Sequence, residues 1–141
     1  MKTINKTLIT IRVLFFFNIL LISLFAGQTP AKENASKITF NETKHDFGKV
    51  KEGVELTFVF KFKNDGDKNL VIQKVHASCG CTGVAVGDKK EFKNGEEGEI
   101  KVSFNTSRRS GTQSKTVTVQ SNDPENPVAV LSFTCEIISK N

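Results

Sequence analysis

The residues of this chain that are best suited to carry out chemistry lie in one short stretch. Residues 76–82 read His-Ala-Ser-Cys-Gly-Cys-Thr and hold two of the three cysteines, Cys79 and Cys81. In an extended strand, residues two apart point to the same face, so the two thiols would lie side by side. Their Cα atoms would be about 6.6 Å apart in a straight strand, near the upper limit for a disulfide. Gly80 can adopt backbone conformations that shorten this gap, so a local disulfide is feasible.

The same two thiols raise the question of redox chemistry. A disulfide across so small a ring would be strained, and strained disulfides exchange readily with thiols. Thiol–disulfide enzymes usually place two residues between their cysteines and use a helix N-terminus to lower the thiol pKa, and residues 76–82 show neither feature. Cys135 falls on the inward face of the last predicted strand, where a buried thiol is ordinary. We therefore predict a local Cys79–Cys81 pair and a reduced Cys135, with thiol exchange as an alternative.

A metal site is the second alternative for this stretch. Two thiolates on one face suit Cu(I) or Zn(II). His76, three residues before Cys79, offers a third ligand, and His45 is a distant fourth candidate. In a regular strand, however, His76 falls on the opposite face from the cysteines, and a structural zinc site has four ligands. The favoured interpretation has no cofactor, and a copper or zinc site at His76, Cys79 and Cys81 stays open.

The segments that position this motif show the two-residue period of half-buried strands. Leu56, Phe58, Phe60 and Phe62 alternate with mostly polar residues, and the turn sequence Asn-Asp-Gly-Asp follows at 64–67. Side chains at alternate positions of a strand point to one face of the sheet. We therefore predict that these apolar side chains face the core.

The strand that leads into the motif changes phase. Leu70 and Ile72 lie on one face, whereas Val75 and Ala77 continue on the other parity, so we expect a β-bulge near residues 73–74. Upstream, a first strand that is broken or bent is predicted. The remaining expected strands and turns are the strands within 100–104, 117–119 and 129–137 and the turns at 93–99 and 121–127.

Short alternating segments with turns every 8–12 residues, in about 110 residues, are typical of an immunoglobulin-like sandwich. After the N-terminal region, no segment shows apolar residues at the spacing of an amphipathic helix. The predicted fold is all-β, an immunoglobulin-like antiparallel β-sandwich of about seven strands. The chain has no tryptophan, so an antibody-type core is excluded, and the 12 phenylalanines include the side chains expected to fill this core.

The N-terminus has the pattern of a secretory signal peptide. Lys2, Lys6 and Arg12 precede an apolar run of about 15 residues from Val13 to Gly27, which is shorter than the roughly 20 residues that span a bilayer. No membrane span is expected after cleavage, and the protein is predicted to be exported, either periplasmic or secreted. The predicted divisions are a signal peptide at 1–28, a linker at 29–37, the sandwich domain at 38–138 and a tail at 139–141.

The charge of the mature chain is small. The sequence has 20 basic and 15 acidic residues, and removing the three basic residues of the signal leaves a net charge of about +2. Nucleic-acid binding requires clustered basic residues. The one adjacent arginine pair, Arg108–Arg109, lies in a Ser/Thr/Gly turn and is interpreted as solvated. The charge pattern therefore argues against a nucleic-acid partner.

Three stretches resemble a known family. They are HDFGKVKEG, LTFVFKFKNDGDKNLVIQKVHASCGCT and NGEEGEIKVSFNTSRRSGTQSKTVTVQSND. Together they resemble a family of exported bacterial domains of unknown function, common in Bacteroidetes, with a Ser-Cys-Gly-Cys-Thr signature. The family is similar to Hydin-type and major-sperm-protein-like β-sandwiches. The resemblance implies export and an immunoglobulin-like fold, and it implies no activity.

No catalytic motif is present: the sequence lacks G-x-S-x-G, H-E-x-x-H and a phosphate loop. We therefore expect a protein that is not an enzyme and has no catalytic residues. The predicted role is an exported binding or structural module of the cell envelope, whose partner is another envelope protein bound through an edge strand or end loops. The alternative is a protein that binds copper or zinc, or exchanges thiols, through Cys79 and Cys81. The oligomeric state is left open.

Overall fold

The computed structural model describes residues 34–138, which form strands joined by turns and loops. The predicted signal peptide, residues 29–33 of the predicted linker and the predicted tail lie outside the described residues. Within the described range, no helix is long and apolar enough to cross a bilayer. The nine strands are β1 (Ile38–Phe40), β2 (Lys44–Lys51), β3 (Glu55–Asn64), β4 (Leu70–Ala77), β5 (Thr82–Val86), β6 (Glu91–Phe92), β7 (Glu97–Asn105), β8 (Gly111–Ser121) and β9 (Val128–Ile138).

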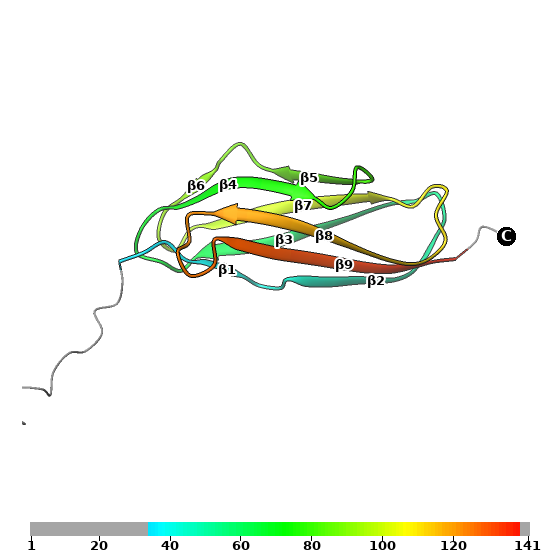
Figure 1. Ribbon diagram of the computed structural model, residues 1–141, viewed down its shortest axis with the longest axis horizontal. Coiled ribbons are helices and arrows are strands. Elements are labelled where there is room, and N and C mark those ends of the chain that lie inside the picture. The colour runs from blue at the N-terminus through cyan, green and yellow to red at the C-terminus, as the bar shows by residue number, and fades with distance from the viewer. Residues whose placement is uncertain (1–33, 139–141) are drawn as a thin grey trace, which may run out of the picture. The chain divides into compact units, whose positions relative to one another are not determined.

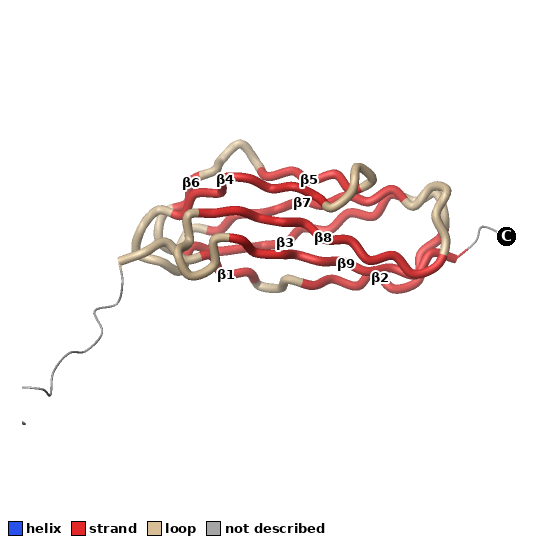
Figure 2. Tube along the Cα trace, viewed as in Figure 1, coloured by secondary structure: helices blue, strands red, loops and turns tan. Residues whose placement is uncertain are grey.

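The strands form two sheets that pack face to face (Figures 1 and 2). One sheet has the order β1-β3-β7-β5 and the other the order β2-β9-β8-β4-β6. The two inner faces bury alternating side chains against each other, as in other β-sandwiches. The predicted all-β sandwich is confirmed. Its strands exceed the expected seven because β1 and β2 are separate and because the short strands β5 and β6 carry no clear periodic signal.

The core is built from the predicted alternation. Phe60 and Phe62 on β3 are fully buried, while Leu56 and Phe58 on the same face pack against the core at its border. Phe104 and Phe133, from opposite sheets, meet with ring centroids 5.6 Å apart. Offset and tilted aromatic pairs of this kind are favourable beyond the area they bury. Phenylalanine therefore fills the centre of the sandwich, as predicted.

The first strand is broken, as predicted, and the break moves the chain between sheets. β1 pairs with β3 in an antiparallel arrangement, whereas β2 lies parallel to β9 in the other sheet. The register of β2 shifts between Asp46 and Lys49, where Gly48 adopts a left-handed φ of 66°. The β2–β9 pair is thus the one parallel pair among the described strands of the antiparallel sandwich, because the bent strand enters the second sheet beside the last strand and runs in the same direction.

The predicted phase change in β4 is also present. Its pairing with β8 shifts register between Ile72 and Lys74, which is the bulge expected from the sequence. The turns predicted at 64–67 and 121–127 lie between β3 and β4 and between β8 and β9. The bulge turns Val75 and Ala77 toward the core border and leads β4 out toward the cysteines.

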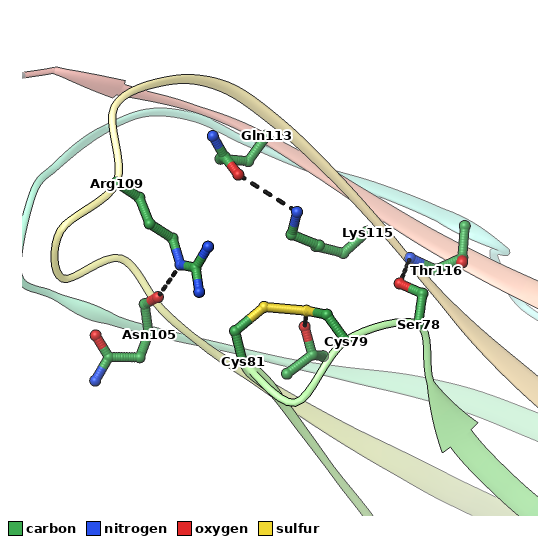
Figure 3. Close-up of a disulfide and its surroundings, with 9 residues drawn as sticks. Ser78, Cys79, Cys81, Asn105, Arg109, Gln113, Lys115 and Thr116 are labelled. Carbon is green, nitrogen blue, oxygen red and sulfur yellow. Dashed lines mark hydrogen bonds between the residues drawn. A yellow bond between two sulfur atoms is a disulfide. The ribbon is translucent and has the colours of Figure 1, made fainter.

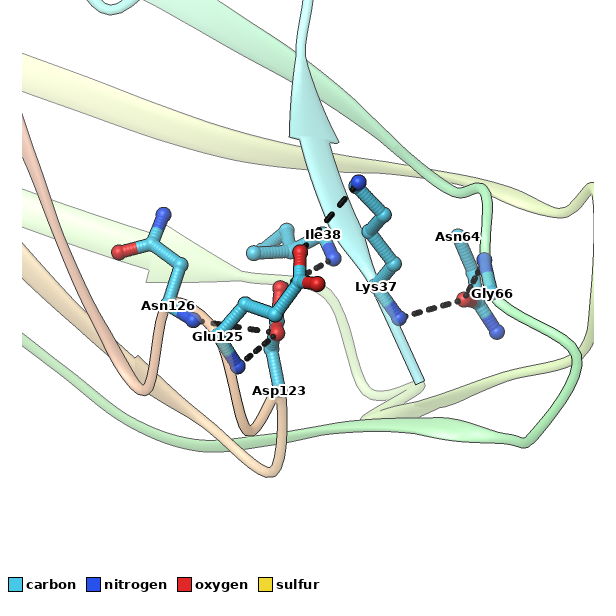
Figure 4. A network of polar contacts seen from close by, with 7 residues as sticks. All are labelled: Lys37, Ile38, Asn64, Gly66, Asp123, Glu125 and Asn126. Carbon is cyan, nitrogen blue, oxygen red and sulfur yellow. Dashed lines mark hydrogen bonds and ion pairs between the residues drawn. The ribbon is translucent and has the colours of Figure 1, made fainter. Parts of the chain in front are cut away.

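Two buried polar side chains fasten the chain where it enters the sandwich (Figure 4). Asn64 accepts the N–H groups of Lys37 and Gly66 and donates to the carbonyl oxygens of Lys68 and Phe92. Asp123 accepts the N–H of Ile38 and two N–H groups of its own turn.

Residues 34–37, which the sequence assigns to the linker, also contact the fold. The hydroxyl of buried Ser36 donates to the carbonyl of Asn122, and the carbonyl of Ala35 accepts the N–H of Asp67. This segment is therefore fixed along the turns that follow β3 and β8.

Candidate functional site

Cys79 and Cys81 lie where the chain crosses from one sheet to the other. β4 belongs to the five-stranded sheet and β5 to the four-stranded sheet, and residues 78–81 connect them. The two sulfur atoms are bonded as a disulfide, and the Cα atoms are 5.3 Å apart. This separation is shorter than that of a straight strand, because the chain turns at this point. Gly80 does not adopt a left-handed φ, so the turn does not use the conformational freedom expected of it.

The loop that carries the disulfide is held by hydrogen bonds at both ends. The N–H of Ser78 donates to the carbonyl of Thr116, and the Ser78 hydroxyl accepts the Thr116 N–H. On the other side, the N–H of Thr82 donates to the carbonyl of Cys79, and the Thr82 hydroxyl lies 3.5 Å from the Cys79 sulfur. Thr82 itself is buried. The disulfide therefore has a fixed position at one end of the sandwich.

Two cationic side chains lie beside this loop (Figure 3). The guanidinium of Arg109 and the ammonium of Lys115 lie 5.6 and 5.8 Å from the centre of the Phe104 ring. Phe104 is the strand partner of Thr82, the residue after Cys81. Arg109 also donates from Nε to the carbonyl of Asn105. The turn was expected to be simply solvated, but Arg109 packs on the edge of the core beside the disulfide.

Arg109 lies in the loop between β7 and β8, whereas Lys115 lies on β8 itself. Arg108 adopts a left-handed φ of 58°, which is uncommon for a residue with a side chain. Its N–H donates to the carboxylate of Glu52 at 3.0 Å. Buried Thr106 donates its N–H to the carbonyl of Val54 and accepts the Val54 N–H at its hydroxyl oxygen. The neighbouring loop therefore holds Arg108 in a conformation that isolated chains avoid.

A surface pocket opens at the same end of the molecule. It is lined by Cys81, Asn105, Ser107, Arg108 and Arg109. Cys81 is half-buried: it lines this pocket and also packs against the border of the core. The charged groups of this lining are both cationic. The pocket is thus suited to a group that carries negative charge and approaches the disulfide.

The metal ligands considered from the sequence are not brought together. His76 is exposed on the outer face of β4, where it pairs with Thr118, whereas the cysteines lie in the loop beyond the strand. His45 lies on β2, with its ring stacked on Phe58 at a centroid distance of 3.5 Å. Within residues 34–138, no group of three or more histidine, cysteine or acidic residues is placed to hold a metal ion.

Cys135 lies apart from the disulfide. It is on the inward face of β9, is 2% exposed and has a free thiol. Burial raises the pKa of this thiol, since the low-dielectric interior disfavours the thiolate. Cys135 is therefore a packing residue in a neutral form.

The disulfide closes a loop that is too short for the cross-link to stabilise the fold strongly. In the chain-entropy model, a loop of three residues gains only about 1.6 kcal/mol at 25 °C, whereas long loops gain several kcal/mol. Its contribution to the stability of the fold is thus expected to be small. Stabilisation by cross-linking is a weak explanation for two cysteines at this position.

A second candidate site lies along the side of the sandwich. β6 pairs only with Leu70 and Val71, so no described strand covers the edge of β4 at residues 73–77. β5 is the outer strand of the opposite sheet. A groove between these two edges has a lining of Ile72, Gln73, Lys74, Val75, Val84, Val86 and Lys90. This groove could not be predicted from the sequence, because it forms only through the position of β5 in the other sheet.

Comparison with solved structures confirms the immunoglobulin-like fold. A protein of unknown function from Porphyromonas gingivalis W83 is 17% identical with a TM-score of 0.63, covering 77% of this chain and 51% of that one. The VesB protease of Vibrio cholerae is 13% identical with a TM-score of 0.60, covering 73% and 32%. The human CEP192 PapD-like domain 7 is 11% identical with a TM-score of 0.57, covering 82% and 94%.

At these identities the likeness concerns the fold alone. The chain spans about half the length of the Porphyromonas gingivalis protein and about a third of the VesB protease. No curated protein matches the sequence. The model of a family described as protein of unknown function, DUF1573, matches residues 38–137, which is nearly all of the described sandwich. The chain therefore belongs to the DUF1573 family.

Proposed function

We propose that this protein is an exported, non-catalytic module of the cell envelope that binds an extended segment of another envelope protein at β5. The segment adds to the free edge of β5 as a further strand, which is a common mode of peptide recognition. The observation that carries this proposal is the absence of any charged residue or proline in β5, whose sequence is Thr-Gly-Val-Ala-Val.

The other outer strands of the two sheets are protected from strand addition. β1 and β6 are only three and two residues long. β2 has the sequence Lys-His-Asp-Phe-Gly-Lys-Val-Lys, with a register shift in its middle. Short length, charges and irregularities are the usual means by which proteins prevent edge pairing. β5, at five residues, is longer than β1 and β6, and it has neither charged residues nor a register shift in its pairing with β7, which is expected of an edge that serves as a binding site.

The groove beside β5 indicates the chemistry of the bound segment. Val84 and Val86 are half-buried, and Val75 lies opposite them on β4. Lys74 and Lys90 are the charged residues of the lining. A segment with apolar side chains at alternate positions and acidic residues at its ends would match this groove.

Export and the absence of catalysis form part of the same proposal. The basic head and short apolar run before Gln28 support removal of a signal peptide. The sequence lacks the catalytic motifs named above, and the family is one of unknown function.

We also propose that Ser-Cys-Gly-Cys-Thr is a signature of this family and that the family is related to Hydin-type domains. Intact mass of the protein recovered from its host is expected to show loss of the N-terminal signal.

Strand addition is tested with a synthetic peptide. The probe is a nine-residue peptide that alternates valine and threonine and carries a glutamate at each end. Titration calorimetry should detect binding, and hydrogen exchange should show new protection of the β5 amides. Ala85→Lys places a charge on the exposed side of β5 and is expected to weaken binding about tenfold or more, or roughly 1.4 kcal/mol.

Val130→Lys is the matched control. Val130 is an exposed valine on β9, at the outer face of the five-stranded sheet. It should leave peptide binding unchanged. If Val130→Lys abolishes binding and Ala85→Lys does not, the binding surface is the outer face of that sheet and the proposal fails. A second peptide carries lysine in place of glutamate at each end. If neither peptide binds, the proposal is also contradicted.

A further inference from the structure

We propose that the Cys79–Cys81 disulfide is an exchange site that accepts electrons from a dithiol whose cysteines lie among acidic residues. This inference is independent of strand addition at β5, since it concerns the end of the sandwich and a different set of residues. It rests on three observations: the position of Cys81 in a pocket, the cations beside the loop and the hydroxyl next to Cys79.

The pocket gives a partner thiolate a route to the disulfide. Cys81 forms part of the pocket lining, with Arg108 and Arg109 as the charged members of that lining. A thiolate that enters the pocket therefore approaches Cys81 beside two arginine side chains. Electropositive, partly exposed surroundings are those in which cysteine sulfur is reactive. An acidic peptide around the attacking thiolate would be attracted by the same charges.

The cations are fixed in place before any partner arrives. Arg109 is held by its hydrogen bond to the Asn105 carbonyl and by the Phe104 ring. Lys115 contacts the same ring and donates to the side-chain oxygen of Gln113 at 3.3 Å. Figure 3 shows both side chains on the same side of the loop as the disulfide. Residues 76–82 have no helix N-terminus to stabilise a thiolate. Fixed positive charge from Arg109 and Lys115 can take that role.

The exchange proceeds in two balanced steps. The partner's first thiolate attacks the Cys81 sulfur, the Cys79–Cys81 bond breaks, and Cys79 leaves as a thiolate that the Thr82 hydroxyl, 3.5 Å away, can hydrogen-bond. The partner's second thiolate then attacks the partner sulfur of the mixed disulfide and releases Cys81. The partner dithiol is oxidised to a disulfide, and Cys79 and Cys81 take up two electrons and two protons.

The test measures the rate of this reaction with two probe peptides. Each has two cysteines separated by two residues, one with glutamates and one with lysines on either side of them. The oxidised protein is mixed with each peptide, quenched by alkylation, and the fraction of modified Cys79 and Cys81 is measured by peptide mass. The acidic peptide is expected to react about tenfold faster than the basic one, and salt should reduce the difference.

Variants at Arg109 and Lys115 then test whether these two cations cause the difference in rate between the peptides. Arg109→Gln with Lys115→Gln should slow the acidic peptide about tenfold and remove its advantage, and Arg109→Lys with Lys115→Arg should restore most of it. Lys61→Gln with Lys68→Gln makes the same charge change at exposed positions away from the disulfide and should have no effect. Equal rates for both peptides, no loss in the double glutamine variant, or no exchange at all would overturn the proposal.

Discussion

The carboxylate of Asp123 accepts the backbone N–H of Ile38 at 2.9 Å, although the two residues are 85 positions apart. Asp123 is 2% exposed and also accepts the N–H groups of Glu125 and Asn126. One buried side chain therefore both shapes the β8–β9 turn and fastens the start of β1 to it.

Asp123→Ala is expected to lower the free energy of unfolding by about 3 kcal/mol, because it leaves three N–H groups without their acceptor. Urea unfolding measures this change. Glu125→Ala is the control: its side chain is 72% exposed and pairs with Lys37 at the surface, so its loss should cost less than about 0.5 kcal/mol. Similar losses for the two variants would show that Asp123 has no special structural role.

Gly98→Ala is expected to destabilise the protein by about 2 kcal/mol through overpacking. A Cβ at Gly98 would overlap the rings of Phe62 and Phe92, which pack edge to face in the core. Thermal unfolding followed by circular dichroism measures the effect. At Gly80 a Cβ would meet no atom within 4 Å, and φ is not left-handed, so Gly80→Ala should leave both stability and the disulfide intact.

Replacing both Cys79 and Cys81 by alanine is expected to cost no more than about 1.6 kcal/mol, since the disulfide closes only a three-residue loop. Chemical unfolding of the variant and of the oxidised protein gives the difference. The fold should stay intact by circular dichroism. A loss of several kcal/mol would instead show that the disulfide is a major structural support of the β4–β5 crossover.

Cys135 is expected to make the folded protein less stable at alkaline pH. Burial raises its pKa in the folded state, so its contribution is fully present below the pKa of the unfolded thiol, about 8.5, and is lost as the pH rises through the folded value. Unfolding measured between pH 7 and 10 should show this decline. Iodoacetamide should modify Cys135 slowly in the folded protein and rapidly in urea, and Cys135→Ala should weaken the alkaline decline.

The sequence predicted the parts of the fold that local periodicity encodes. The inward face of Phe58, Phe60 and Phe62, the bulge near residues 73–74 and the broken first strand all follow from the order of apolar residues. The parallel pairing of β2 and the sheet to which β5 belongs depend on contacts between distant segments. Strand preferences reflect such surroundings more than the residues themselves, so local patterns did not reveal these two features.

The candidate site was predicted only in part, for the same reason. Cys79 and Cys81 were identified from their types and spacing. Arg109 lies 28 positions after Cys81, and only the pairing of β5 with β7 brings the following loop beside the disulfide. Asn64 and Asp123 occur in sequences typical of turns, where these residues are usually solvated. Their burial becomes visible only when the N-terminal segment packs across both turns.

The parallel arrangement of β2 and β9 has a mechanical consequence. The start of β1 and the end of β9 lie at opposite ends of the sandwich (Figure 1), and β2 and β9 run in the same direction. Once the short β1 has separated from β3, a force that pulls these two ends apart would draw β2 and β9 past each other along their length. Their inter-strand hydrogen bonds would then be loaded together in shear rather than opened one at a time. The strand that switches sheets thus makes the domain suited to carrying tension along its long axis.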